Sequence, residues 1–240
     1  LQDFKRLAGL VREMVKVTGE GRLGVKIRAG WDRSTASPVE LAQMLAANGA
    51  AWITLHPRTA RQGFAGRAEW GLLKEVKEHV SVPVLGSGDL FSASQALSCL
   101  HQTGIDGVMF ARGAMNNPGV FGQLRRVIQE SDDRAEDTRR EQSPGPRCGA
   151  FFKDEVPDGG PACSAQQALS DLTAIALRHI ELSREHGRSP KAFLRMRTVL
   201  PRYLRGFSGA KALRSQIVEC VDWLELQEFV HGLSGRMRSC

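Results

Sequence analysis

Strand and helix patterns alternate over the first 130 residues, and this alternation constrains the fold more than any other feature of the chain. Apolar runs typical of buried strands lie at 23–30, 51–59, 82–89 and 107–114. Segments with helical spacing of their apolar residues follow these runs, at 38–49, 67–80, 92–104 and 117–130. Such alternation with short loops predicts parallel strands joined by right-handed helical crossovers. The runs are rich in Val, Ile and Leu, as in strands covered on both faces, so the sequence predicts an α/β fold.

Two α/β architectures fit this pattern: an open doubly wound sheet, and a (β/α)8 barrel of which four units make one half. Charged and polar residues gather where the predicted strands end, namely Lys26, Arg28, His56, Arg58, Asp89 and Arg112. Both architectures place functional residues at the carboxyl ends of their strands, so position alone does not choose between them.

The remainder of the chain has a different character. Residues 131–163 are charged and then rich in Pro and Gly, without an apolar period, which is typical of a flexible linker or a surface insertion. Helical periodicity returns over 164–240. We therefore expect residues 1–130 and 164–240 to form an α/β part and a small all-helical domain.

Small residues follow the third and fourth predicted strands. The third strand ends in Gly86-Ser87-Gly88-Asp89 and the fourth in Ala111-Arg112. Glycines between a strand and a helix let backbone N–H groups approach an anion, and a guanidinium adds charge. Taken alone, the glycines could merely turn the chain. Together, the two strand exits predict a phosphate site shared by neighbouring loops.

Two further residues are candidates for a site at this edge. Lys26 shares a strand face with Arg28, and in a barrel it would point inside, where a lysine needs an acceptor such as an electron-rich cofactor ring. A carboxylate partner would be the structural alternative. His56 ends its strand beside Arg58, where either a structural role or contact with a cofactor is consistent with the sequence.

A cationic run marks the helical part. Six basic residues and no acidic ones lie between Lys191 and Lys211, with Phe193, Tyr203 and Phe207 among them. Cations neutralise phosphates and aromatic rings can stack on unpaired bases, so the run predicts contact with nucleic acid. A solvated helix face with core aromatics is the alternative.

The cysteines and the hydropathy exclude several classes of protein. The five cysteines form no CxxC pair and are odd in number, which favours reduced thiols in a cytoplasmic protein and no metal site. None lies where a catalytic thiolate is expected. No run approaches the ~18 apolar residues of a membrane span.

At this point the motifs resemble those of a known family, the flavin-dependent tRNA-dihydrouridine synthases. The resemblance rests on VKIRAGWD, ITLHPRTARQGFAGRAEW, VPVLGSGD, TGIDGVMFARGAMNNPGVF and LRMRTVLPRYLRGFSGA, in this order. It implies a (β/α)8 barrel that binds FMN, followed by a helical tRNA-binding domain. It also implies that NADPH reduces FMN, that the flavin gives hydride to C6 of a uridine in tRNA, and that a cysteine protonates C5.

The resemblance carries over to individual positions. It places Lys26 and His56 near the flavin ring and the FMN phosphate on Ser87, Gly88, Asp89, Ala111 and Arg112. The substrate contacts expected on this interpretation are Arg28, Arg58, Arg195, Arg202 and Arg205. Pro57, Ser87 and Ala111 depart from the family's usual Gly, Asn and Gly.

The largest departure is that the first half of the barrel, with the family's catalytic cysteine, has no counterpart here. The chain is thus expected to be the C-terminal half of the barrel plus the helical domain, completed by a longer chain or a partner, and not to turn over alone. A non-catalytic RNA-binding protein with the same fold is the alternative function, and an unrelated FMN barrel with a helical tail is a third.

Overall fold

The computed structural model of the protein describes residues 3–35, 37–141, 165–187, 189, 191–205, 207 and 209–233. Contacts within the chain divide it into two compact units, residues 1–111 and residues 112–240. None of the described helices combines the length and the hydropathy that crossing a bilayer requires.

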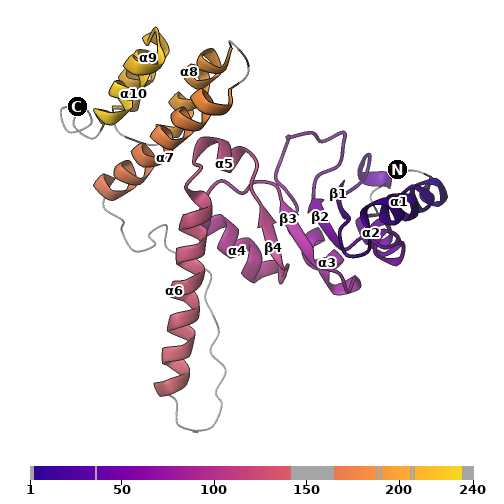
Figure 1. Ribbon diagram of the computed structural model, residues 1–240. Helices are drawn as coiled ribbons and strands as arrows, with labels where there is room; N and C mark the ends of the chain where they lie inside the picture. Colours follow the sequence, from indigo (N-terminus) through magenta and orange to yellow (C-terminus); the bar gives the residue numbers. More distant parts are fainter. Residues whose placement is uncertain are drawn as a thin grey trace. The chain divides into compact units, whose positions relative to one another are not determined.

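The first unit is built on a parallel sheet of four strands. These are β1 (Gly24–Arg28), β2 (Trp52–His56), β3 (Val84–Ser87) and β4 (Gly107–Met109). Each strand pairs with the next one along the chain, in the order β1-β2-β3-β4 (Figure 1). The predicted α/β fold with a parallel sheet is therefore confirmed. The prediction was wrong at the end of the fourth strand, because the chain leaves the sheet after Met109 and is helical from Arg112.

Helices precede and connect the strands. They are α1 (Phe4–Thr18), the short 3-10 helix η1 (Arg33–Thr35), α2 (Pro38–Ala47), α3 (Gly71–His79) and α4 (Ala93–Thr103). Local sequence sets their ends: the Ser92 hydroxyl accepts from the Gln95 N–H at 3.2 Å, and Gly104 ends α4 in the left-handed region.

The two faces of the sheet differ in chemistry because successive residues of a strand point to opposite sides. Ile53, Leu55 and Val84 are fully buried on the face toward the connecting helices. The opposite face, here called the polar face, carries Gly24, Lys26, Arg28, Trp52, Thr54, His56 and Ser87. Lys26 is exposed, and the Trp52 ring lies so close to Gly24 that a Cβ there would be 2.0 Å from it.

The second unit is helical in its described part. Its helices are α5 (Arg112–Asn116), α6 (Val120–Glu141), α7 (Ala165–His186), α8 (Ala192–Tyr203), α9 (Ala210–Glu219) and α10 (Trp223–His231). Helix α6 continues eleven residues beyond its predicted end at 130. The rest of the predicted linker, apart from these residues, lies outside the described part of the chain.

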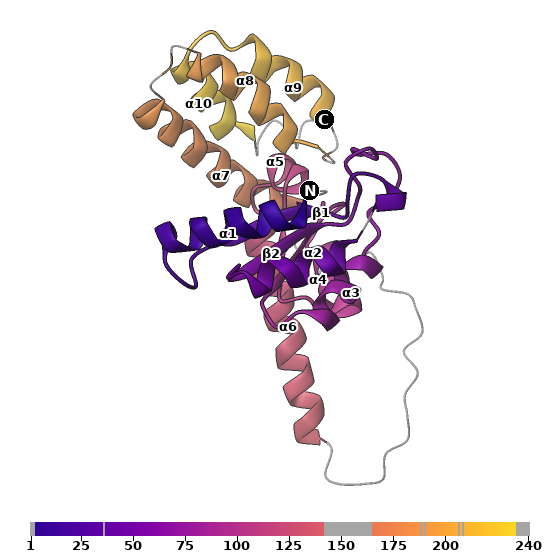
Figure 2. The same cartoon turned by 90° about the vertical axis from the view of Figure 1, so that its right-hand side faces the viewer.

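Helices α7 to α10 pack around a common apolar core (Figure 2). On α7, Leu169, Leu172, Ala176 and Ile180 recur at helical spacing and are buried. The chain forms two helices over 210–231, and Cys220 lies between them as the residue that ends α9. The break is capped reciprocally: the Asp222 carboxylate accepts from the Glu225 N–H, and the Glu225 carboxylate accepts from the Val221 N–H.

Candidate functional site

The carboxyl ends of β1, β2 and β3 bring polar side chains together on the polar face. In the pairing of β1 with β2, Lys26 lies opposite Thr54 and Arg28 lies opposite His56. The pairing of β2 with β3 puts Ser87 on this face as well. A ligand at this edge would meet groups from three consecutive strands.

Backbone hydrogen bonds join the loops that follow β1 and β2. Ala29 N–H donates to the carbonyl of Arg58 at 3.2 Å, and Ala60 N–H donates to that of Gly30 at 2.8 Å. A third bond runs from Arg61 N–H to the carbonyl of Trp31 at 2.9 Å. The two loops therefore form one connected rim beside the polar face.

A buried ion pair fixes this rim to the loop after β3. The guanidinium of Arg58, whose side chain is only 2% exposed, donates from Nη1 to Oδ1 of Asp89 at 2.9 Å and from Nη2 to Oδ2 at 2.7 Å. Arg58 also donates to the carbonyls of Ala65 and Gly66. The Asp89 carboxylate accepts a further bond from the Ala68 N–H at 2.8 Å. This arrangement, here called the Arg58 clamp, is fully hydrogen-bonded and bidentate.

The clamp gives Arg58 and Asp89 roles that differ from those expected. Arg58 was predicted to contact substrate, but its donors are directed to Asp89 and to two carbonyls inside the protein. Asp89 was predicted to hold a phosphate, but both of its carboxylate oxygens accept bonds from the protein. The two residues therefore hold the loops after β2 and β3 together. A carboxylate that is already paired has no donor to offer to an anion, so Asp89 does not bind a phosphate directly.

His56 ends β2 on the polar face, and it is buried. Gly88 has a φ of +107°, and a Cβ there would lie 2.7 Å from Cδ2 and 2.9 Å from Nε2 of His56. The indole N–H of Trp70 donates to the Gly88 carbonyl at 3.2 Å. Burial, and then the positive charges of Arg28, Lys26 and Arg58, lower the pKa of His56 to about 4. The imidazole is therefore neutral at physiological pH.

Lys26 and Arg28 make the polar face cationic. Arg28 donates from Nη1 to the carbonyls of Thr59 and Gly63, each at 3.0 Å, and its guanidinium lies 5.9 Å from the centre of the Phe64 ring. The Lys26 side chain forms neither a hydrogen bond nor an ion pair with any other residue in the described part of the chain. Partial loss of hydration around the ammonium, and then the positive charge of Arg28, lower the pKa of Lys26. The carboxylate partner that was the structural alternative for Lys26 is thus not seen among these residues.

The remaining candidates lie at the exits of β3 and β4. The two strands pair with Ser87 opposite Met109, two residues before Ala111, and Ser87 is buried. Ala111 is exposed, as is Arg112 at the start of α5. The register therefore places the two strand exits side by side in the sheet.

The thiols within the described residues lie away from this edge. Cys99 is fully buried in α4, and this burial raises the pKa of its thiol to about 11. A hydrogen bond from Thr103 lowers the pKa, but by less than burial raises it. Cys220 is buried in the helical core. Both thiols are therefore buried and have packing roles, since a reactive thiolate needs an accessible, electropositive site.

The cationic run of the helical unit is accessible. Arg195 and Arg205 are exposed and Arg202 is partly so, and none of the three forms an ion pair with a described residue. Arg195 and Arg202 are seven residues apart on α8 and therefore share a face.

The aromatic residues of this run were expected to stack on bases, and for two of them the structure favours the alternative. Tyr203 is buried, with its hydroxyl 2.7 Å from Nδ1 of His179. Phe193 packs edge-on against Trp223 with ring centres 5.3 Å apart. Tyr203 is therefore a core residue, whereas Phe193 and Phe207 are both partly buried and pack against the core.

Several residues that shape the site were missed from the sequence. Ala68 and Trp70 hold the loop after β3 through one bond each, and Trp31 and Phe64 present exposed rings on the rim. Trp31 and Phe64 could have been recognised from the sequence, because both follow predicted strands and exposed aromatics on loops often mark binding surfaces.

Fold and site together define an α/β protein whose cationic and polar groups gather at the carboxyl edge of a parallel sheet, with a basic helical unit following. The sequence model of the family described as "Dihydrouridine synthase (Dus)" matches residues 1–233. The chain therefore belongs to the dihydrouridine synthase family.

Curated relatives carry related names. The chain is 32% identical over 195 residues to a probable tRNA-dihydrouridine synthase 1 of a Synechocystis species, covering 81% of the chain and 46% of the relative. It is 29% identical over 212 residues to a probable tRNA-dihydrouridine synthase of Mycobacterium tuberculosis, covering 88% and 47%. With a similarly named protein of Treponema pallidum the identity is 43% over 110 residues, covering 44% and 32%. The chain thus spans about half the length of the curated relatives it matches, or less.

Proposed function

We propose that this chain is the C-terminal portion of an FMN-dependent tRNA-dihydrouridine synthase that uses NADPH as reductant. Residues 1–130 would be the second half of a (β/α)8 barrel, 131–163 a connecting segment, and 164–240 a tRNA-binding domain. The observation that carries the proposal is the register that sets Arg28 beside His56, with Ser87 on the same face, in a chain that matches the family over 1–233.

The strand order supports the barrel part of the proposal. The order β1-β2-β3-β4 follows the chain without reversal. Doubly wound sheets reverse their order at a switch point, whereas barrel strands keep chain order. The polar face would then point into the barrel, and the other half would come from a longer chain or a partner.

The polar face suits an anionic, electron-rich ring. Lys26 has no described partner and lies near a second cation, Arg28, so an acceptor there would relieve repulsion between like charges. Lys26 and His56 would hold the flavin ring, and Ser87, Gly88, Ala111 and Arg112 the phosphate. Asp89 would shape this loop through the Arg58 clamp. Bound FMN would supply the hydride that reduces the C5–C6 bond of uridine.

His56 would act as a neutral hydrogen-bonding group. Because its pKa is about 4, one ring nitrogen carries a proton and the other accepts near pH 7. Its ring lies against Gly88, so it can orient a planar ligand without adding charge. The acid that protonates C5 would be the family's cysteine, which the resemblance places outside residues 1–240.

The redox part of this proposal predicts that purified protein binds FMN and that Lys26→Met weakens this binding about tenfold, through loss of one charge-assisted contact. Flavin fluorescence titration measures the affinity. Lys5→Met, on the exposed part of α1, is the matched control and should bind FMN like the unsubstituted protein. The coding sequence containing this chain should also restore dihydrouridine in tRNA of a strain lacking these enzymes. Binding of tRNA without binding of FMN would favour the non-catalytic RNA-binding alternative.

The RNA part predicts that Arg195→Ala, Arg202→Ala and Arg205→Ala together weaken tRNA binding and reduce the slope of log affinity against log salt by about 2–3, since each phosphate contact releases counterions. Filter binding at several salt concentrations measures both quantities. Arg125→Ala, Arg178→Ala and Arg184→Ala remove the same charge from other exposed positions and should change the slope less. Equal slopes for the two triple variants would contradict an RNA contact by the cationic run.

A further inference from the structure

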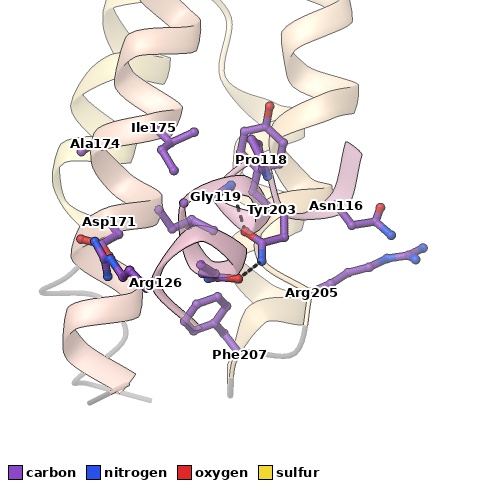
Figure 3. Close-up of a pocket in the computed structure, with 14 residues that line it drawn as sticks. Asn116, Pro118, Gly119, Arg126, Asp171, Ala174, Ile175, Tyr203, Arg205 and Phe207 are labelled. Carbon is purple, nitrogen blue, oxygen red and sulfur yellow. Dashed lines mark hydrogen bonds and ion pairs between the residues drawn. The ribbon is translucent and has the colours of Figure 1, made fainter. Parts of the chain in front are cut away.

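A pocket of about 480 Å³ lies within the second unit, and its lining shares no residue with the site at the sheet edge. Its walls come from the segment joining α5 to the first turn of α6, from α7, and from the segment after α8 (Figure 3). The volume is within the range of roughly 300–1,000 Å³ typical of small-molecule sites. The pocket is therefore large enough for a planar ring together with a sugar and a phosphate.

Side-chain amides form one wall. Asn117 donates from Nδ2 to Oε1 of Gln123 at 2.9 Å, and its Oδ1 accepts from the Gly119 N–H at 3.1 Å. These bonds fix Asn117 and the acceptor end of Gln123. The Nε2 group of Gln123 and the whole amide of Asn116 make no hydrogen bond to another residue in the part that the structure describes. Two amides are thus free to pair with the edge of a base.

Aromatic and charged side chains also line the pocket. Tyr203 lines the pocket while its hydroxyl is held by His179, and the partly buried Phe207 is a second aromatic lining residue (Figure 3). The charged lining residues are Arg126, Arg205 and Asp171. Nη1 of Arg126 lies 3.7 Å from Oδ2 of Asp171, so these two charges offset each other. With Arg205 added, the charged lining residues carry a net positive charge. Amide, ring and cation are the groups that recognise the edge, the face and the phosphate of a nucleotide.

Arg205 belongs both to this pocket and to the run Lys191–Lys211 proposed to contact RNA. We infer that the pocket accepts one unpaired nucleotide of the bound RNA, at a place distinct from the uridine that is reduced. This inference rests on the proposed RNA substrate. The base pairs with Asn116 and Gln123 and packs on Phe207, and Arg205 neutralises the phosphate beside it.

Gly122 offers a direct test of this inference. It lines the pocket in the first turn of α6, and a Cβ at this position meets nothing within 4 Å. Gly122→Leu therefore adds apolar bulk to the lining of the pocket, its Cβ meets no neighbouring atom, and leucine is the better helix former. Asn116→Ala removes one free amide instead. The matched control is Gln216→Leu, an exposed position on α9 that does not line the pocket.

The full chain with Gly122→Leu should bind an unmodified tRNA transcript about tenfold more weakly than the unsubstituted chain, as expected for the loss of one stacked base. Asn116→Ala should weaken binding less, and Gln216→Leu should leave it unchanged. Uridine 5′-monophosphate should shift the amide resonances of Asn117 and Gly119 in the unsubstituted chain but not in Gly122→Leu.

Unchanged tRNA affinity in Gly122→Leu would overturn the inference. Weaker tRNA binding with unmoved Asn117 and Gly119 resonances would overturn it as well, because the surface and not the pocket would then contact RNA. Both measurements report binding alone. The pocket inference can therefore be overturned although dihydrouridine is still formed, and the redox proposal can be overturned although the pocket binds a nucleotide.

Discussion

Arg58→Ala is expected to lower the free energy of unfolding of the first unit by about 3–5 kcal/mol, the range for removing one partner of a buried ion pair. The Arg58 side chain is 2% exposed and Asp89 is 26% exposed, so the remaining carboxylate would be left largely desolvated. The carbonyls of Ala65 and Gly66 would lose their donors too. Because the clamp joins the loops after β2 and β3, both loops should loosen together.

Denaturant unfolding monitored by the fluorescence of Trp52 and Trp70 measures this loss. Arg61→Ala is the matched control, since Arg61 lies in the same loop but forms a surface pair with Asp32 at 3.4 Å and is 69% exposed. The free energy of unfolding of Arg61→Ala should stay within about 0.5 kcal/mol of that of the unsubstituted protein. Similar losses for the two variants would show that the clamp is no stronger than a surface pair.

The second large effect is expected at Gly88. An alanine Cβ would lie 2.7 Å from the His56 ring and 3.0 Å from the Ala68 Cβ, at a φ of +107° that side chains rarely adopt. Gly88→Ala should therefore displace His56 and cost about 2–3 kcal/mol of unfolding free energy, from steric overlap added to backbone strain. Since His56 is proposed to hold the flavin ring, FMN affinity should fall at least tenfold.

Gly104→Ala separates strain from displacement. Gly104 also has a positive φ, +65°, but an added Cβ meets nothing within 4 Å there, and the residue ends α4 away from His56. Gly104→Ala should lower the free energy of unfolding by about 1 kcal/mol and leave FMN affinity unchanged. If Gly88→Ala bound FMN as tightly as Gly104→Ala, the position of His56 would have no bearing on flavin binding.

Local patterns were sufficient to predict much of the first unit. Alternation of apolar runs with helical segments predicted the parallel sheet, and the two-residue repeat of a strand put Lys26 and Arg28 on one face. The end of the fourth strand was less predictable, because Phe110 to Ala114 has no periodicity that separates a strand from a helix start.

Features that depend on distant residues could not be predicted. Arg58 and Asp89 are 31 residues apart, and only the folded loops show that each uses the other's charge. A sequence presents both as charged groups at strand ends, where a ligand contact and a buried pair look alike. Likewise, Tyr203 lies in a cationic run, and its burial follows from the packing of α7 against α8.

The three backbone bonds between the loops after β1 and β2, with the Arg58 clamp beyond them, have a consequence for protein engineering. Transplanting residues 57–70 alone from a relative would separate donors from acceptors that belong to residues 29–31 and to Asp89. A graft that keeps these hydrogen bonds must exchange the loops after β1, β2 and β3 together.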